Sequence, residues 1–222
     1  MSWESSLEYY RVINQVIRER LGGLHCARIV MHSVDFAQIA ALQDEGDWEQ
    51  LTELMIGAAQ RLEVAGAEFL AICCNTMHKV ANCVQKDIRI PLLHIVDATA
   101  HEILERKLKK VGLVGTKVTM EEDFFRDRLV SKHNLEVMIP DEHERQIAND
   151  VVYNELCRGE MTQSARQELV DMMQNLAANG AEGIILGCTE LGLLIDPQDV
   201  RVPVFDTTTI HAKAAAMFAL EQ

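Results

Sequence analysis

The sequence predicts an α/β fold with mainly parallel sheets, built from two similar halves. Short apolar runs alternate with amphipathic segments of helical period along the 222 residues. In addition, residues 66–76 and 180–190 nearly repeat one another. Each begins with Gly-Ala-Glu, continues as an apolar run, and reaches a cysteine that small polar residues follow. We therefore expect two pseudo-symmetric α/β domains that share an interdomain cleft.

The first half is expected to contain three helices and three strands. Gly22-Gly23 ends the first helix, over residues 5–21, and Asp47 can cap the second. The strands are the apolar runs at 28–34, 69–73 and 90–95, and a further helix begins at Asp97. The apolar faces of the first two helices are expected to be Leu7, Tyr10, Ile13, Ile17 and Leu21, and Leu51, Leu54, Met55, Ala58 and Leu62.

The pattern restarts at Val111-Gly-Leu-Val-Gly, which opens the second half with a strand. Further strands are expected at 135–139, 183–187 and 202–205, and helices at 120–130, 144–157, 163–178 and after residue 206. The first domain should therefore comprise residues 1–105 with the last helix, 207–222, and the second residues 106–206. No Pro-rich or Ser-rich linker separates them.

The repeat also bears on the start of the chain. When the second half is superimposed on the first at Cys188 and Cys74, its opening strand, residues 111–115, falls at or before residue 1. A parallel sheet that lacks an interior strand leaves backbone groups unpaired. We therefore expect the encoded protein to begin upstream of Met1, with a short apolar strand that ends in Gly-Gly.

Composition favours a cytoplasmic protein that acts on a small molecule. The net charge of −13 argues against nucleic acid as a partner, because phosphate contacts need clustered Lys and Arg. No apolar run reaches the length of about 18 residues that a membrane span needs, and no basic-then-apolar export signal opens the chain. The six cysteines form no CxxC pair, so free thiols in a reducing compartment are expected.

Cys74 and Cys188 are the candidate catalytic residues. Both end an expected parallel strand, at the edge where such sheets bind ligands. One thiol from each half can place two acid/base groups on opposite faces of one bound carbon, which is the geometry that inverts a stereocentre. Free cysteine is a common core residue, and we expect that role for Cys73 and for the other three, Cys26, Cys83 and Cys157.

Small polar residues beside these cysteines are the candidate substrate contacts. Asn75 and Thr76 follow Cys74, and Thr189 follows Cys188. Thr116 and Thr119 end the opening strand of the second half in a similar way. If helices begin at these points, their free N–H groups favour a carboxylate ligand.

Other polar residues have supporting roles or none. Asp35 and Glu190 can polarise a nearby thiol, and His101 and His211 can orient groups in the cleft or cap helices. His78 stands four residues after Cys74, but no second Cys/His cluster has zinc spacing, so no metal is expected. No Gly-rich phosphate loop and no lysine in a pyridoxal-phosphate context is present, so no cofactor is expected.

Four motifs resemble the aspartate/glutamate racemase family. They are Cys-Asn-Thr-Met-His at 74–78, Val-Gly-Thr at 114–116, Gly-Cys-Thr-Glu at 187–190 and Pro-Val-Phe-Asp-Thr at 203–207. The resemblance covers essentially the whole chain. The opening Met-Ser-Trp-Glu-Ser and the segments 21–25 and 32–36 resemble its enterobacterial branch of broad-specificity, or L-aspartate/glutamate-specific, amino-acid racemases.

The resemblance implies a cofactor-independent racemase that is usually a homodimer, with Cys74 and Cys188 as its two acid/base residues. It also implies that Asn75, Thr76 and Thr189 hold the substrate carboxylate, with Gln43 and Met77 near the substrate. Family members begin with a strand that ends in Gly-Gly-Met, whereas this chain starts at that Met. Some members of the branch carry Thr where Cys74 stands and favour one enantiomer, so cysteine at both positions implies a two-thiol enzyme.

Three functions remain open from the sequence. The first is racemisation of a small amino acid such as aspartate, glutamate or homoserine. The second is another reaction of the same superfamily, by a maleate isomerase, a hydantoin racemase or a decarboxylase, which reuse one or both cysteines. The third is a non-enzymatic role, either as a two-lobed binder of a small ligand or as a thiol redox sensor. The sensor would use Cys73 and Cys74, although adjacent cysteines are poorly placed for a disulfide.

Overall fold

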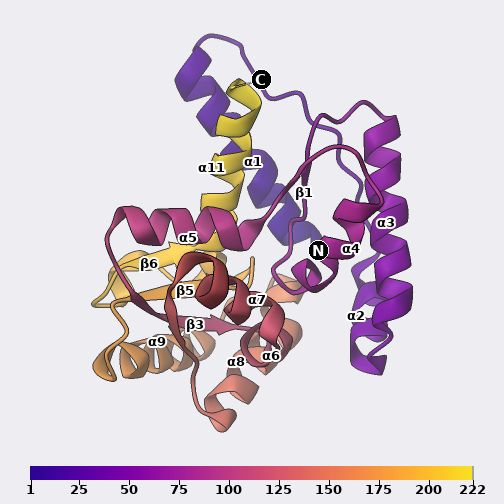
Figure 1. Ribbon diagram of the computed structural model, residues 1–222. Helices are drawn as coiled ribbons and strands as arrows, with labels where there is room; N and C mark the ends of the chain where they lie inside the picture. Colours follow the sequence, from indigo (N-terminus) through magenta and orange to yellow (C-terminus); the bar gives the residue numbers. More distant parts are fainter. Residues whose placement is uncertain (222) are drawn as a thin grey trace. The chain divides into compact units, whose positions relative to one another are not determined.

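The computed structural model describes residues 1–221 and has an α/β fold in which every strand pair is parallel, as predicted (Figure 1). The chain divides into two compact units. The first comprises Met1–His94 and the residues from Ala212 onward, and the second comprises Ile95–His211.

The second unit is built on a four-stranded sheet of order β4-β3-β5-β6. Its strands are β3 (Lys110–Gly115), β4 (Glu136–Met138), β5 (Gly183–Gly187) and β6 (Val204–Asp206). Every residue of β5 is buried, as expected for a strand that is covered on both faces. Figure 1 shows α5 (Ile95–Glu105) and α9 (Gln163–Ala178) on opposite faces of this sheet. The four predicted strands of this half are confirmed, with small differences at their ends.

Helices complete the second unit, and side-chain caps begin two of the long ones, α8 (Glu142–Asn154) and α9. Asp141 and Glu144 form a capping box at α8, and the Thr162 hydroxyl accepts a hydrogen bond from Ala165 N at α9. The helical segments are α5 (Ile95–Glu105), α6 (Lys117–Glu121), α7 (Asp123–Asp127), the π-helix η2 (Arg128–Lys132), α8 (Glu142–Asn154), η3 (Leu156–Arg158), α9 (Gln163–Ala178), α10 (Leu191–Leu194), η4 (Pro197–Asp199) and α11 (Thr207–Leu220).

The division between the units differs from the expected boundary after residue 105. Helix α5 belongs to the second unit, because Ile95, Val96, Ala100 and Ile103 are buried in that unit's hydrophobic core. The second boundary falls inside α11, between His211 and Ala212.

Asp97 ties α5 to the π-helix η2. Its carboxylate accepts hydrogen bonds from Arg128 Nε at 2.7 Å, Lys132 Nζ at 2.7 Å and His133 Nε2 at 2.8 Å. Burial alone would raise the pKa of Asp97, but these three donors outweigh it and hold the pKa well below its ordinary value. The carboxylate is therefore ionised throughout the neutral range.

The first unit contains a smaller sheet, in which β1 (Leu70–Ala71) pairs with β2 (Leu92–Leu93). Asp47 caps α3 (Trp48–Val64) by accepting from Gln50 N, as predicted, and the α3 face with Leu51 and Met55 is buried. The helical segments are α1 (Trp3–Leu21), α2 (Phe36–Glu45), α3 (Trp48–Val64), η1 (Thr76–Val80) and α4 (Ala81–Lys86). A core of α2, α3, β1, η1 and α4 side chains holds this unit together.

Residues 28–34 are not the strand that the sequence predicts. The segment is largely exposed and belongs to neither sheet. The repeat supplies the reason. In the second unit, β4 pairs with β3 and not with β5, and residues 1–94 contain no counterpart of β3. Without that neighbour, an apolar and β-branched segment has no ladder to join.

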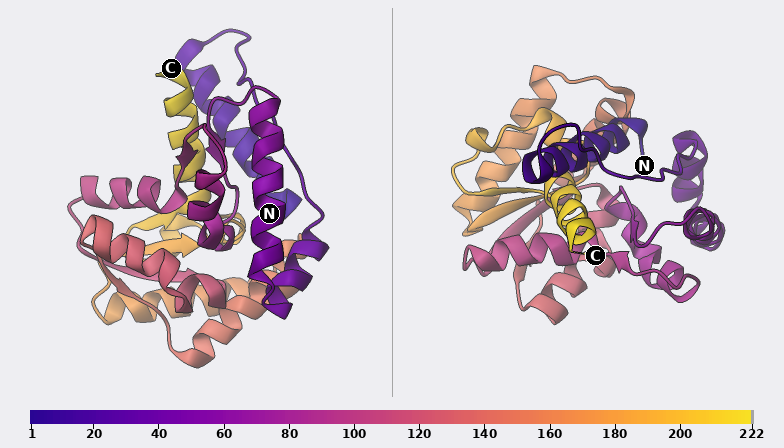
Figure 2. Two further views of the ribbon diagram at one scale, coloured as in Figure 1. Left: turned by 45° about the vertical axis from the view of Figure 1, so that its right-hand side comes forward. Right: turned by 90° about the horizontal axis from the view of Figure 1, so that it is seen from above.

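The apolar stripe predicted for α1 is also wrong in part. Ile17 is buried, but Leu7, Tyr10 and Leu21 are about half exposed. The helix instead buries Tyr9 and Val12, which pack with Ala212. Figures 1 and 2 show α11 running alongside α1, so the face that α1 buries is set by a helix from the other end of the sequence.

None of the six cysteines forms a disulfide within the described residues 1–221, but they do not all lie where expected. Cys26 and Cys83 are exposed rather than core residues, and Cys73 and Cys157 are partly buried. Burial raises the pKa of Cys73 to about 12. None of the helices within residues 1–221 is long and apolar enough to cross a membrane.

Candidate functional site

Cys74 stands just beyond the carboxyl end of β1, as predicted. It is partly buried, and its backbone N–H donates to Ile72 O at 2.8 Å. The chain then turns directly into the 3₁₀ helix η1, whose N-cap is Asn75. Asn75 and Thr76 are both buried. The first unit thus carries one thiol with an amide and a hydroxyl directly after it.

Three other residues that the sequence predicts at the site, Asp35, Gln43 and Met77, make contacts that support the fold of the first unit. Met77 has no exposed surface, and Gln43 Nε2 lies 3.2 Å from its sulfur. Met77 is therefore a core residue, so any substrate contact falls to its backbone. Asp35 is exposed and caps α2, where its carboxylate accepts from Ala37 N at 3.1 Å. This cap is the role that the structure gives Asp35.

A pair of buried histidines accompanies Cys74. His78 Nδ1 lies 2.7 Å from the carbonyl oxygen of Cys74, and the His94 ring lies 4.6 Å from the His78 ring between centroids. The sequence points to His78 only as a possible metal ligand and assigns no role to His94. The position of His94 in the sequence could have indicated that it lies near Cys74. It directly follows the strand β2, which pairs with β1.

Cys188 occupies the matching place in the second unit, directly after β5, and is buried. Its thiol donates to Glu190 Oε2 at 2.9 Å, and the Thr189 hydroxyl donates to the same oxygen at 2.8 Å. Burial, and then the negative charge of Glu190, raise the pKa of Cys188 well above its ordinary value. The thiol is therefore protonated at neutral pH, with a carboxylate positioned to receive its proton.

Thr116 and Thr119 lie at the same edge of the sheet, just beyond β3. The Thr116 hydroxyl accepts from Thr119 N at 3.3 Å, and the two hydroxyls are 3.0 Å apart. Both side chains are buried. Gly115 pairs in register with Gly187, and a Cβ on Gly115 would lie 2.7 Å from Gly187 O. This close approach brings the Thr116 turn next to the turn that bears Cys188.

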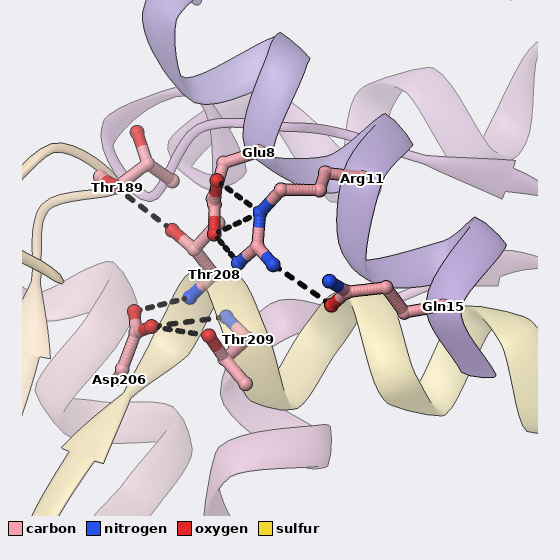
Figure 3. A network of polar contacts seen from close by, with 7 residues as sticks. All are labelled: Glu8, Arg11, Gln15, Thr189, Asp206, Thr208 and Thr209. Atoms are coloured by element: carbon pink, nitrogen blue, oxygen red, sulfur yellow. Dashed lines mark hydrogen bonds and ion pairs between the residues drawn. The ribbon is translucent and has the colours of Figure 1, made fainter. Parts of the chain in front are cut away.

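Two further threonines at this edge were not selected from the sequence. Thr207 and Thr208 follow β6 and are buried. Thr207 Oγ1 donates to Leu186 O at 2.7 Å. Thr208 Oγ1 donates to Thr189 O at 3.1 Å, as Figure 3 shows. Asp206 accepts from the backbone N–H of Thr208 at 3.0 Å and so fixes this turn (Figure 3). The signal was available, since both residues lie within three positions of the end of the expected strand, 202–205.

The two histidines predicted to support the site differ in environment. His211 is fully buried in α11. The side chain of His101 is mostly exposed and lies 3.4 Å from Glu105 on the same helix. His101 therefore does not orient a buried group, whereas His211 remains a candidate. Among residues 1–221, no group of three or more His, Cys, Asp or Glu side chains is arranged to hold a metal ion.

Comparison with known proteins points to one family. Residues 1–215 match the model of the Asp/Glu/hydantoin racemase family. The chain is 28% identical over 170 residues to the broad-specificity amino-acid racemase RacX of Bacillus subtilis strain 168, a match that covers 76% of this chain and 72% of that protein.

Solved structures with the same fold are similar over nearly the full chain. A putative Asp/Glu racemase from Yersinia pestis is 50% identical, with a TM-score of 0.91 over 99% of this chain and 96% of that one. An aspartate racemase homologue from Pyrococcus horikoshii OT3 is 35% identical, with a TM-score of 0.82 over 99% and 95%.

Proposed function

Because this chain belongs to the Asp/Glu/hydantoin racemase family and is an amino-acid racemase, we propose that it inverts the α-carbon of a small amino acid with Cys74 and Cys188 as its two bases. One thiolate removes the α-proton from one face of the substrate, and the other thiol delivers a proton to the opposite face. The reverse reaction exchanges the two roles. No cofactor takes part in this proposal.

The observation that carries the proposal is the equivalent position of the two thiols. Each follows a parallel strand of its own unit, and buried polar residues continue the chain after each one. A single base would return the proton to the face that it left. Two bases, one from each half of a duplicated fold, permit inversion.

Cys188 has the properties of the proton donor. Its raised pKa keeps it a thiol in the resting protein, and the Glu190 carboxylate lies within hydrogen-bond distance. When the roles are reversed, Glu190 can hold the proton that Cys188 must lose to become the base. Glu190 is thus proposed as the group that adjusts the protonation of Cys188.

Threonine and asparagine side chains next to the thiols are proposed to hold the substrate carboxylate. Asn75 and Thr76 supply these groups in the first unit, and Thr116, Thr119 and Thr189 supply them in the second. Hydrogen bonds to the carboxylate stabilise the charge that spreads onto it when the α-proton leaves. This stabilisation lowers the barrier to deprotonating a weakly acidic carbon.

The substrate is proposed to be aspartate, glutamate or a related amino acid such as homoserine. Similar structures are described as a putative Asp/Glu racemase and an aspartate racemase homologue, and one relative is a broad-specificity amino-acid racemase. Chiral chromatography after incubation with a panel of L- and D-amino acids tests this choice. Complete inactivity over the panel, with the protein folded, would contradict the racemase function.

The two-base mechanism is tested by comparing Cys74→Ala and Cys188→Ala in deuterated water. Each variant should lose racemisation by a factor of about 10²–10⁴, the usual contribution of a general acid or base. Each should still exchange the α-proton of one enantiomer only, and the two variants should prefer opposite enantiomers. Racemisation at the normal rate by either variant would refute the assignment. Cys83→Ala, which removes an exposed thiol, is the matched control and should be fully active.

The assembly and location of the protein are further parts of the proposal. We propose a homodimer in the cytoplasm, where the reducing environment keeps the six cysteines as thiols. Light scattering coupled to size-exclusion chromatography measures the mass in solution. A mass of 25.0 kDa, that of one chain, at working concentration would contradict the dimer.

A further inference from the structure

The buried histidines beside Cys74 have no part in the mechanism proposed above, yet they contact the catalytic turn directly. His78 and His94 are 3% and 8% exposed. Burial of two imidazole rings is costly unless their polar atoms are satisfied. The contacts of these two side chains should therefore show which part of the site they hold in place.

The contact between His78 and Cys74 defines the direction of the hydrogen bond. The distance from Nδ1 to the Cys74 carbonyl oxygen is 2.7 Å, at the short end of the range for N–H···O bonds. A carbonyl oxygen can only accept. The proton of this bond must therefore be on Nδ1, and His78 is the donor.

The type of helix explains why a side chain makes this bond. In η1 the backbone N–H of His78 bonds to Asn75 O, three residues back, at 3.0 Å. An α-helix would have sent that N–H to Cys74 O, four residues back. The imidazole Nδ1–H therefore takes the place of the backbone donor that the 3₁₀ geometry directs elsewhere.

His94 braces the ring of His78. It is the first residue after β2, and β2 pairs in parallel with β1, so the two strands deliver His94 and Cys74 to the same edge of the small sheet. The two rings are tilted by 58°, with centroids 4.6 Å apart, which is close packing for aromatic side chains. The His78 ring is therefore restricted in rotation as well as hydrogen-bonded.

We propose that His78, braced by His94, is a positioning residue that fixes the peptide group between Cys74 and Asn75. A peptide group is planar, so holding its carbonyl oxygen also fixes the direction of the Asn75 N–H. The bond thereby sets both the approach of Cys74 Sγ to the α-carbon and the donor next to it. This inference rests on the proposed function, because it assigns a role in delivering Cys74 to the substrate.

The test compares two amide variants that differ in where they place a donor. In His78→Asn the side-chain nitrogen can occupy the position of Nδ1, whereas in His78→Gln it reaches the position of Nε2. The Asn variant should therefore retain the bond to Cys74 O, and the Gln variant should lose it. We expect His78→Asn to keep kcat within about twofold, and His78→Gln to lower kcat by about three- to tenfold with little change in KM, as for the loss of one hydrogen bond.

A second measurement uses no substrate. The alkylation rate of Cys74, determined by mass spectrometry, should rise in His78→Gln because the turn is released, and should be unchanged in His78→Asn. The exposed thiols Cys26 and Cys83 are internal references, and Cys73, with a pKa of about 12, stays protonated at pH 8. Melting temperatures of the two variants show whether they are equally folded.

The outcomes separate this inference from the function on which it rests. If the unmodified protein racemises its substrate and the two variants behave alike in both kcat and alkylation, the positioning role is refuted and the racemase function stands. If the unmodified protein is inactive on every amino acid, the proposed function fails. In that case, faster alkylation in His78→Gln alone would still support the role of His78 in holding the turn, and equal rates would refute it.

Discussion

The thiol of Cys188 donates a hydrogen bond to Oε2 of Glu190 over 2.9 Å, and both residues are buried. The same oxygen accepts from the Thr189 hydroxyl. A carboxylate that accepts two such bonds is held in one orientation, and its charge opposes ionisation of the neighbouring thiol. Burial and the Glu190 carboxylate, two positions along the chain, therefore both keep Cys188 protonated.

Replacing Glu190 with Gln should lower the pKa of Cys188. Gln has nearly the same shape and can still accept a hydrogen bond, but it has no negative charge. The pKa should stay above the ordinary value, because burial is the larger cause of the shift. Thiolate absorbance at 240 nm, measured against pH, follows this ionisation. The contribution of Cys188 is the difference between a protein with Cys188 and the same protein with Cys188→Ser, taken once with Glu190 and once with Glu190→Gln. An unchanged titration would show that Glu190 does not act on the thiol.

Replacing Asp97 with Asn should destabilise the second unit in a pH-dependent way. The pKa of Asp97 is lowered in the folded state, so its ionisation stabilises the fold above the unfolded pKa of about 4. This contribution is lost as the pH falls below that value towards the folded pKa. We expect Asp97→Asn to cost about 1–3 kcal/mol at pH 7, with the difference from the unmodified protein shrinking below pH 4.

Urea unfolding at a series of pH values measures this effect. The matched control is Asp123→Asn, which removes the partner of Arg126 in a more exposed pair on α7. That variant should change the free energy of unfolding by less than about 1 kcal/mol. A constant difference between Asp97→Asn and the unmodified protein from pH 7 to pH 3 would contradict the role given to the charge.

Gly115→Ala and Gly57→Ala should have opposite effects on stability. A methyl group on Gly115 would lie 2.7 Å from the backbone oxygen of Gly187, which cannot move without disturbing the sheet. Near Gly57, inside α3, the nearest atom is the end of the Arg61 side chain at 3.8 Å. Thermal unfolding should show a loss of about 1–3 kcal/mol for Gly115→Ala and a gain of about 0.5–1 kcal/mol for Gly57→Ala. Equal effects of the two changes would disprove the close approach of β3 and β5.

Thr208→Val should weaken catalysis more than Thr209→Val does. The Thr208 hydroxyl is buried and donates to the backbone carbonyl of Thr189, next to Cys188, whereas the partly exposed Thr209 hydroxyl donates to Asp206 (Figure 3). Valine preserves the shape of threonine and removes the donor. We expect about a three- to tenfold lower kcat/KM for Thr208→Val, as for one lost hydrogen bond, and less than a twofold change for Thr209→Val. A larger loss in Thr209→Val would reverse the assignment.

Elements of the second unit were predicted best, because their signals are local. The apolar run of β5 and the periodic segment of α9 were predicted with the bounds that the structure shows, 183–187 and 163–178. The positions of Cys74 and Cys188 after parallel strands were likewise predictable, because the repeat marks them both.

The errors arise where distant segments decide the outcome. An apolar segment forms a strand only beside a partner, and residues 28–34 have no neighbouring strand in either sheet. The buried face of α1 is set by contact with Ala212, about two hundred residues away along the chain. The bond from His78 to Cys74 O depends on η1 being a 3₁₀ helix, which the periodicity of five residues cannot reveal.

The discontinuous make-up of the first unit has a consequence for synthesis on the ribosome. The N-terminal residues emerge first, but the α11 residues that cover Tyr9 and Val12 come only after the 117 residues of Ile95–His211. At about 5–20 residues per second, roughly 6 to 25 s pass before that helix is made. All residues of the contiguous second unit are made within this interval, whereas the side of α1 with Tyr9 and Val12 stays uncovered until the interval has passed. The part of the protein that is translated first is therefore the part that is completed last.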